Sequence, residues 1–149
     1  MRYLGIDYGD RRTGLAVCDA GGRIVSPLAV LPSDGALVDR IAGIIAQEGI
    51  EALVLGLPLN MDDTEGPQAR KVRRFAEALG AKVSIPICFQ DERLSSFEAA
   101  DRLADLSLTR KGRKKRLDAV AAAGILQAFL AREAGEEGSS SSSDTPGTR

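Results

Sequence analysis

The chain has 149 residues, of which 44% are hydrophobic and 28% are charged, a balance typical of one globular domain with its own core. It contains no histidine. This excludes the commonest general base, the usual histidine-activated nucleophiles and the commonest zinc ligand, so a catalytic metal would be held mainly by carboxylates. No apolar run approaches the roughly 20 residues that span a bilayer, and no secretory signal is visible, so we expect a cytoplasmic protein without membrane contact.

The charges are distributed unevenly, although the net charge is only −1. From residue 134 onward, three acids and one arginine contribute −2, and the segment contains five consecutive serines. This composition is typical of disorder, so we expect a folded domain at residues 1–133 and a disordered, serine-rich acidic tail at residues 134–149. Two basic runs lie within the domain. Arg70–Arg74 is interpreted as the solvated face of a helix, whereas Arg110–Arg116 is expected to precede a helix and suits contact with a phosphate backbone.

Three strands are predicted at the start of the chain, at residues 3–6, 13–18 and 23–31, because each is an apolar run bounded by turn residues. Gly9 and Gly14 are interpreted as turn residues between the first two strands. The second strand ends at Cys18. This cysteine and Cys88 both fall in strand-like apolar runs, and we expect them to be reduced core residues.

Helices and strands alternate in the rest of the chain. Apolar residues at helical spacing predict the helices, and short apolar runs predict the strands. Pro86 lies within the last strand and indicates an edge position or a bulge. The predicted helices are 34–49, 66–80, 95–106 and 116–132, and the predicted strands are 51–58 and 82–93. A three-strand meander followed by alternating helix and strand predicts an α/β fold, with a five-stranded mixed sheet and helices on both faces.

Three acidic positions interrupt the apolar pattern. Asp7 ends the first strand, Asp91 and Glu92 end the fifth, and Asp118 lies on the apolar stripe in the first turn of the last helix. A turn cap would explain Asp7 and the helix dipole would explain Asp118, but an unpaired buried carboxylate costs several kcal/mol. Three carboxylates meeting at one sheet edge could instead hold two divalent ions for phosphodiester hydrolysis. Neighbouring strand residues face opposite ways, so only one of Asp91 and Glu92 is expected to be a ligand, and periodicity does not choose between them.

Four blocks of this sequence resemble the signature blocks of the YqgF family, bacterial proteins described as pre-16S rRNA nucleases and Holliday junction resolvase homologues. The blocks are GIDYGDRRTGLA (5–16), LGLP (55–58), DERLSS (91–96) and LDAVAAAGILQAFL (117–130). They occur in order over nearly the whole chain up to about Leu130. The resemblance implies an RNase H-like nuclease domain, which agrees with the predicted order of strands and helices.

The resemblance also implies roles for individual residues. The catalytic acids and metal ligands would be Asp7, Glu92 and Asp118, with Mg²⁺ or Mn²⁺ as the cofactor. Arg12 and Arg93 would be candidates for contacting the scissile phosphate or its neighbours. The flanking backbone would be bound by Lys111, Arg113, Lys114 and Lys115. In the loop after Pro58, the family tends to place a glycine where this chain has Asp63.

The expected activity is that of a two-metal endonuclease that processes the 5′ end of pre-16S rRNA. A Holliday junction resolvase, acting on branched DNA, is the alternative within the same chemistry. A resolvase would have to be a symmetric dimer, so the oligomeric state expected is monomer or homodimer. A sugar-kinase or actin-like ATPase is disfavoured because such proteins need two domains of this size. A non-catalytic nucleic-acid-binding factor with the same fold remains the competing hypothesis.

Overall fold

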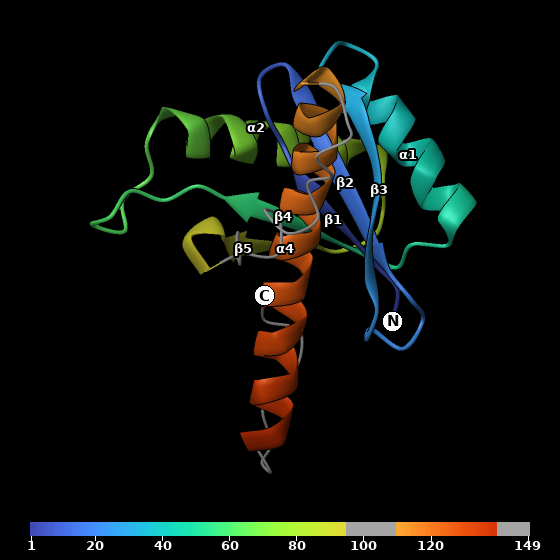
Figure 1. Ribbon diagram of the computed structural model, residues 1–149, viewed down its shortest axis with the longest axis vertical. Helices are drawn as coiled ribbons and strands as arrows, with labels where there is room; N and C mark the ends of the chain where they lie inside the picture. Colours follow the sequence, from blue (N-terminus) through green and yellow to red (C-terminus); the bar gives the residue numbers. More distant parts are fainter. Residues whose placement is uncertain (95–109, 140–149) are drawn as a thin grey trace.

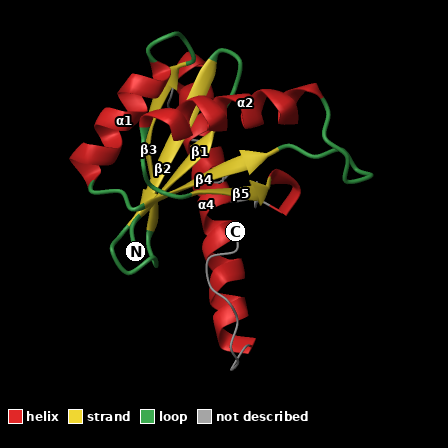
Figure 2. Cartoon of the chain, turned by 180° about the vertical axis from the view of Figure 1, so that it is seen from behind, coloured by secondary structure: helices red, strands yellow, loops and turns green. Residues whose placement is uncertain are grey.

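A mixed five-stranded sheet forms the middle layer of the molecule, between two helices on one face and one long helix on the other (Figure 1). The computed structural model describes residues 1–94 and 110–139, with side chains at 1–93 and 117–135. The strands are β1 (Tyr3–Asp7), β2 (Arg12–Cys18), β3 (Val25–Pro32), β4 (Ala52–Leu57) and β5 (Ile87–Asp91). The helices are α1 (Leu37–Glu48), α2 (Pro67–Lys82), the single 3-10 turn η1 (Glu92–Leu94) and α4 (Arg110–Ser139). Figure 2 shows α1 and α2 in front of the sheet, with α4 behind it.

The strand order β3-β2-β1-β4-β5 confirms the predicted topology. The pairs β1–β2 and β2–β3 are antiparallel, whereas β1–β4 and β4–β5 are parallel. Because β1, β4 and β5 run in the same direction, their carboxyl ends lie at one edge of the sheet, where sites gather in open α/β sheets. β5 is an edge strand, as Pro86 indicated, but it covers only Ile87–Asp91, so the predicted bounds 82–93 were too wide and Pro86 lies just before the strand.

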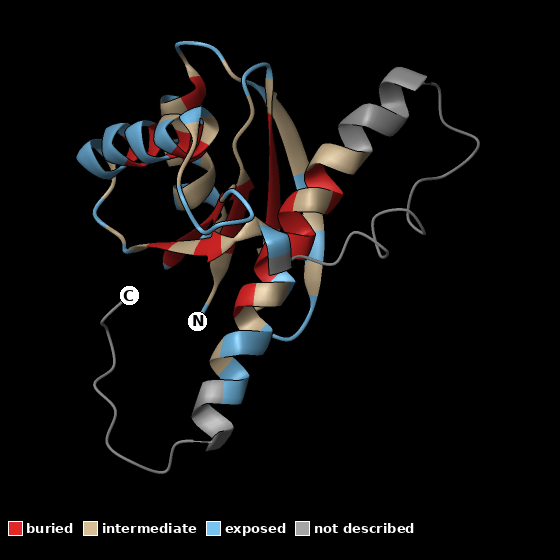
Figure 3. Cartoon of the chain, turned by 90° about the vertical axis from the view of Figure 1, so that its left-hand side faces the viewer, coloured by how far each residue is buried: buried red, intermediate tan, exposed pale blue. Residues whose placement is uncertain are grey.

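The hydrophobic core has one part on each face of the sheet. Leu4 and Ile6 of β1 face α1 and α2. They belong to the same buried cluster as Leu79 of α2. On the other face, Val54 of β4 packs with Phe129 of α4. Figure 3 shows that burial in α4 is concentrated in its middle, where the helix crosses the sheet. Within the described ranges, no helix has both the length and the apolar character that a membrane crossing requires.

The last helix differs most from its predicted bounds. α4 begins at Arg110 instead of residue 116, because lysine and arginine are good helix formers and the single Gly112 does not stop the helix. The basic run therefore forms the first turns of α4, and the prediction that it precedes a helix was wrong. The helix continues to Ser139, so residues 134–139 of the expected tail are helical. The predicted helix 95–106 and residues 140–149 lie outside the described residues.

Both cysteines occupy the positions expected of core residues. Cys18 is 1% exposed and Cys88 is 7% exposed. Neither forms a disulfide. Cys18 packs in the part of the core beneath α4, together with Val54 and Phe129.

Candidate active site

Asp7 and Asp118 are brought together by the packing of α4 on β2. Asp7 is the last residue of β1, and it is paired with Gly14 of β2. A Cβ atom on Gly14 would collide with the backbone carbonyl of Asp118. Glycine at this position therefore lets α4 approach the sheet at the point where β1 ends. The interpretation of Gly14 as a turn residue was wrong, because Gly14 lies within β2 and serves this close approach.

Glu92 reaches the same place from β5. It is the first residue of η1, directly after the strand, and its side chain folds back over β4. A Cβ atom on Gly56 would lie 2.7 Å from Glu92 Oε1, so the glycine in β4 leaves room for this carboxylate. Glu92 then forms a side-chain hydrogen bond with Asp7. Asp91 instead pairs with Arg93, so of the two neighbouring acids Glu92 is the one that contacts Asp7.

The acids are electrostatically coupled. Burial raises the pKa of Asp7 to about 8, with further contributions from the charge of Glu92, the hydrogen bond to Glu92 and the charge of Asp118. Burial also raises the pKa of Glu92, and the charge of Asp91 adds to that shift. Because the pKa of each carboxyl group is raised, ionisation of Asp7 and Glu92 together is unfavourable. A cation bound beside such a cluster would let all its carboxylates ionise.

The donor set fits a hard divalent cation, although the side chains are not arranged as a complete ligand set. Within residues 1–94 and 110–139, no three acidic or cysteine side chains surround one point as metal ligands would. Asp118 Oδ2 instead accepts a hydrogen bond from Arg12 Nε at 2.7 Å. All the donors at the cluster are carboxylate oxygens, which suit Mg²⁺ or Mn²⁺. Binding of all three acids to a metal would require Asp118 to exchange the guanidinium of Arg12 for the cation.

The helix dipole does not explain Asp118. The residue lies more than two turns after the start of α4, and the effect of the dipole falls off within the first turn. Arg12, the first residue of β2, supplies the positive charge that Asp118 faces. The side chain of Arg12 is 35% exposed, and among the described residues its two terminal nitrogens have no hydrogen-bond partner. Within the described part of the chain, its two terminal nitrogens are therefore not committed to a protein acceptor.

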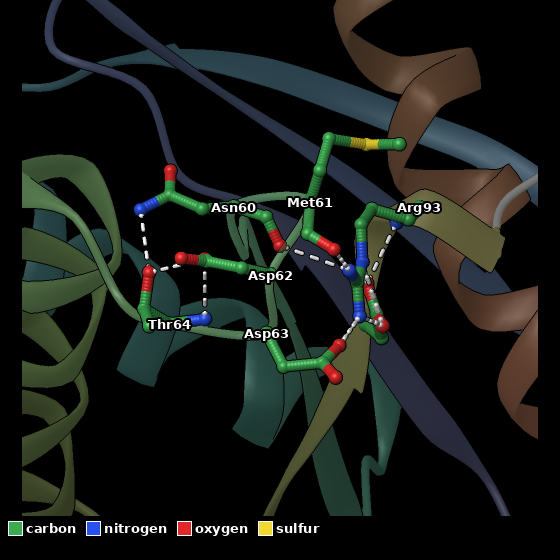
Figure 4. Close-up of polar contacts among 7 residues, drawn as sticks. Asn60, Met61, Asp62, Asp63, Thr64 and Arg93 are labelled. Carbon is green, nitrogen blue, oxygen red and sulfur yellow. Dashed lines mark hydrogen bonds and ion pairs between the residues drawn. The ribbon is translucent and has the colours of Figure 1, made fainter.

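All three guanidinium nitrogens of Arg93 donate hydrogen bonds (Figure 4). Its Nε donates to both oxygens of Asp91 at 3.1 Å, and its Nη2 donates to Asp91 Oδ2 at 2.7 Å. Nη2 also donates to Asp63 Oδ1 at 2.6 Å. Nη1 donates to the carbonyl oxygen of Asn60 at 2.9 Å and faces that of Met61 at 3.5 Å. Asp63 has a φ of 70°, the left-handed conformation that favours glycine, in agreement with the glycine that the family tends to have there.

The contacts between Arg93 and the loop that joins β4 to α2 were not foreseen from the sequence. They join residues about 30 positions apart in the chain, which no local pattern indicates. The sequence signal for this loop was Asp63, which stands where the family tends to have a glycine. Four basic residues were expected to bind the flanking nucleic-acid backbone. They lie in α4, roughly one to two turns before Asp118: Lys111, Arg113, Lys114 and Lys115.

Comparisons with known proteins agree with this geometry. The family model described as "RuvX: Holliday junction resolvase" matches residues 1–132. A "Putative pre-16S rRNA nuclease" of Nitratidesulfovibrio vulgaris (strain DP4) is 42% identical over 134 residues, which cover 88% of this chain and 94% of that protein. One of the same name from Anaeromyxobacter sp. (strain Fw109-5) is 43% identical over 132 residues, covering 87% and 96%. Thermus thermophilus RuvC in complex with Holliday junction substrate matches with a TM-score of 0.61 at 17% identity, over 91% of this chain and 96% of that one, which shows the RNase H-like fold.

Proposed function

The chain belongs to the RuvX family of Holliday junction resolvases, and from that premise we propose that it is a metal-dependent endonuclease that processes the 5′ end of pre-16S rRNA. The observation that carries the proposal is the contact between Asp7 and Glu92, with Asp118 close enough to shift the same pKa. Asp7 and Glu92 come from two separate elements, β1 and η1, which have no structural reason to place two partly buried carboxylates in contact. Asp118 of α4 lies nearby and is paired with Arg12. The names of the relatives support pre-16S rRNA as the substrate.

In the proposed mechanism, different residues bind the metal, the reacting phosphate and the flanking backbone. Asp7, Glu92 and Asp118 would hold Mg²⁺ or Mn²⁺, and the bound metal would supply an activated water and stabilise the leaving oxygen. Arg12 would contact the phosphate, because its terminal nitrogens form the planar fork that suits a phosphate group. Lys111, Arg113, Lys114 and Lys115 would bind the flanking backbone without reading sequence. We place the reaction in the cytoplasm.

Cleavage by the purified protein of a labelled 16S precursor fragment and of a four-way DNA junction tests the proposal. Each substrate is incubated with Mg²⁺, Mn²⁺ or EDTA, beside Asp7→Asn. We expect metal-dependent cutting of the precursor that falls by at least about 100-fold in Asp7→Asn, because that variant loses a metal ligand. Binding without cutting, unchanged in Asp7→Asn, would contradict the catalytic proposal and leave a non-catalytic nucleic-acid-binding factor.

A Holliday junction resolvase is the second candidate, favoured by the description of the family and by the fold shared with RuvC. It predicts faster cutting of the four-way junction than of the RNA fragment, with two symmetric incisions. Such cutting needs two active sites related by a two-fold axis, so the protein would sediment as a homodimer. A monomer that cuts only the RNA fragment would exclude this candidate.

A further inference from the structure

We propose that Arg93 is a positioning residue, which fastens the loop Asn60–Thr64 to the end of β5 and thereby fixes Glu92 against Asp7. Arg93 then makes no contact with a substrate phosphate. The inference rests on the proposed function of the acidic cluster and assigns Arg93 a role different from the one that the family resemblance implied. Its basis is the complete set of partners that surrounds the guanidinium (Figure 4).

The guanidinium of Arg93 has no nitrogen available for a phosphate. An arginine side chain carries five N–H donors on three nitrogens. In Arg93 all three nitrogens have partners: Nε faces Asp91, Nη2 faces Asp91 and Asp63, and Nη1 faces two backbone carbonyls. Arg12 differs in this respect, because among the described side chains only its Nε is engaged. A phosphate would have to displace the partners of Arg93, but it could bind Arg12 without displacing any.

The contacts of Arg93 restrain the backbone on both sides of Glu92. The amide of Arg93 donates to Asp91 Oδ1 at 2.9 Å, and its guanidinium pairs with the same carboxylate. The side chains of Arg93 and Asp91 are 30% and 20% exposed, and Nε and Nη2 of Arg93 bind the two oxygens of Asp91 in the bidentate geometry that favours an ion pair. With residues 91 and 93 bound to each other, the side chain between them is directed to Asp7.

The loop that Arg93 holds has its own internal order. The amide of Asn60 donates to the carbonyl of Thr64 at 2.8 Å, and the amide of Asp63 donates to the carbonyl of Asn60 at 2.9 Å. The base of the loop is bound to α2, where Arg73 makes a bidentate pair with Glu65. Arg93 adds the connection between the tip of the loop and β5. Loss of Arg93 would therefore release the tip while leaving its base attached.

Two variants separate positioning from phosphate binding. Arg93→Met and Arg12→Met are compared for binding to the 16S precursor fragment in EDTA at a series of salt concentrations. Each phosphate contact adds about 0.7–0.9 to the slope of log affinity against log salt. We expect Arg12→Met to lose about one such contact and Arg93→Met to keep the wild-type slope. With metal present, Arg93→Met should lower kcat by about tenfold or more and leave KM nearly unchanged, as expected when the geometry of the catalytic acids is disturbed.

Amide hydrogen exchange measures the positioning role without any nucleic acid. We expect exchange at Asn60 and Asp63 to accelerate by about tenfold or more in Arg93→Met, because the tip of the loop opens more often. Arg93→Lys should fail to restore protection, since an ammonium cannot bridge two carboxylates and two carbonyls as the planar fork does. Asp63→Gly, which removes one partner of Arg93 and suits the φ of 70°, should give a smaller acceleration.

Either of two results would overturn the proposal: a salt slope reduced in Arg93→Met as much as in Arg12→Met, or unchanged exchange at Asn60 and Asp63. If Arg93→Met does not fold, the exchange rates of Asp63→Gly decide whether the contact orders the loop. Wild-type protein that binds neither the RNA fragment nor the junction would contradict the proposed function. The exchange rates would still decide the role of Arg93.

Discussion

At the scale of single residues, Asp7 opposes the stability of the metal-free protein when it ionises. Its folded-state pKa is about 8, whereas the unperturbed value is 3.8. Between these two pH values the folded protein holds a proton that the unfolded chain has lost. Rising pH therefore destabilises the folded state, and the effect is complete above pH 8 and absent below pH 4.

We predict that Asp7→Asn stabilises the protein in EDTA, by about 2–4 kcal/mol at pH 8 and by much less at pH 5, because the amide cannot ionise. Urea denaturation at both pH values measures this difference. Asp39→Asn is a suitable control, since the side chain of Asp39 is 68% exposed and its ion pair with Lys82 lies on the surface. It should change the free energy of unfolding by less than about 0.5 kcal/mol at either pH. An equal gain from Asp7→Asn at pH 5 and pH 8 would show that Asp7 does not titrate in this range.

At the scale of elements, glycines on three strands determine how closely α4 packs on the sheet. A Cβ atom on Gly5 would meet Ala122 and Leu126 of α4 at 2.9 Å, and one on Gly56 would meet Ile125 at 2.5 Å. Gly14 is the tightest of the three, because a Cβ atom there would lie 1.9 Å from the carbonyl oxygen of Asp118, and backbone cannot rotate away. The same close packing that completes the core therefore also places Asp118 beside Asp7.

We predict that Gly14→Ala lowers the free energy of unfolding by about 1–3 kcal/mol or more, because α4 must move away from β2 to make room for the methyl group. Gly43→Ala is the matched control. Gly43 lies within α1, and a Cβ atom there would meet nothing within 4 Å, so alanine should stabilise the helix by about 0.5–1 kcal/mol. Urea denaturation of both variants measures the two changes. A Gly14→Ala protein as stable as the wild type would show that α4 does not lie so close to β2.

The sheet was predictable because its signals are local. The apolar runs of β1, β2 and β4 each predict a strand without reference to the rest of the chain, and Pro86 predicts the edge position of β5, although it lies just before that strand and not within it. The approach of the acids followed from the rule that parallel strands end at the same edge. The start of α4 was missed because its basic run has the charge of a nucleic-acid-binding loop and the propensity of a helix.

Other features of the site depend on contacts that sequence periodicity does not carry. Gly14 is required by a helix that follows about 100 residues later, so its turn-like context was misleading. The choice of Glu92 over Asp91 is made by η1, which turns the chain directly after β5. The partners of Arg93 include a carboxylate and two carbonyls from a distant loop. In each case the tertiary neighbour, and not the local pattern, determines the role of the residue.

At the scale of the whole molecule, α4 carries both groups that the proposed function assigns to this helix. Its first turns contain the basic run, and Asp118 follows in its third turn. The sheet edge beside Asp118 supplies Asp7 and Glu92, and burial raises the pKa of both carboxyl groups, so a bound cation would favour loss of their protons. Metal binding and proton loss are therefore linked at this cluster.

We predict that binding of Mg²⁺ or Mn²⁺ releases close to one proton at pH 7 and almost none at pH 9, because the pKa of Asp7 is about 8 in the metal-free protein. Calorimetric titration in two buffers with different ionisation enthalpies measures the number of protons released. Asp7→Asn should release far fewer protons and bind the metal at least about tenfold more weakly, since an uncharged ligand replaces a carboxylate. Metal binding that releases no proton at pH 7 would mean that the cation binds elsewhere or that Asp7 is already ionised. The same titration on Asp39→Asn should match the wild type, because Asp39 is an exposed acid whose partner is Lys82 on the surface.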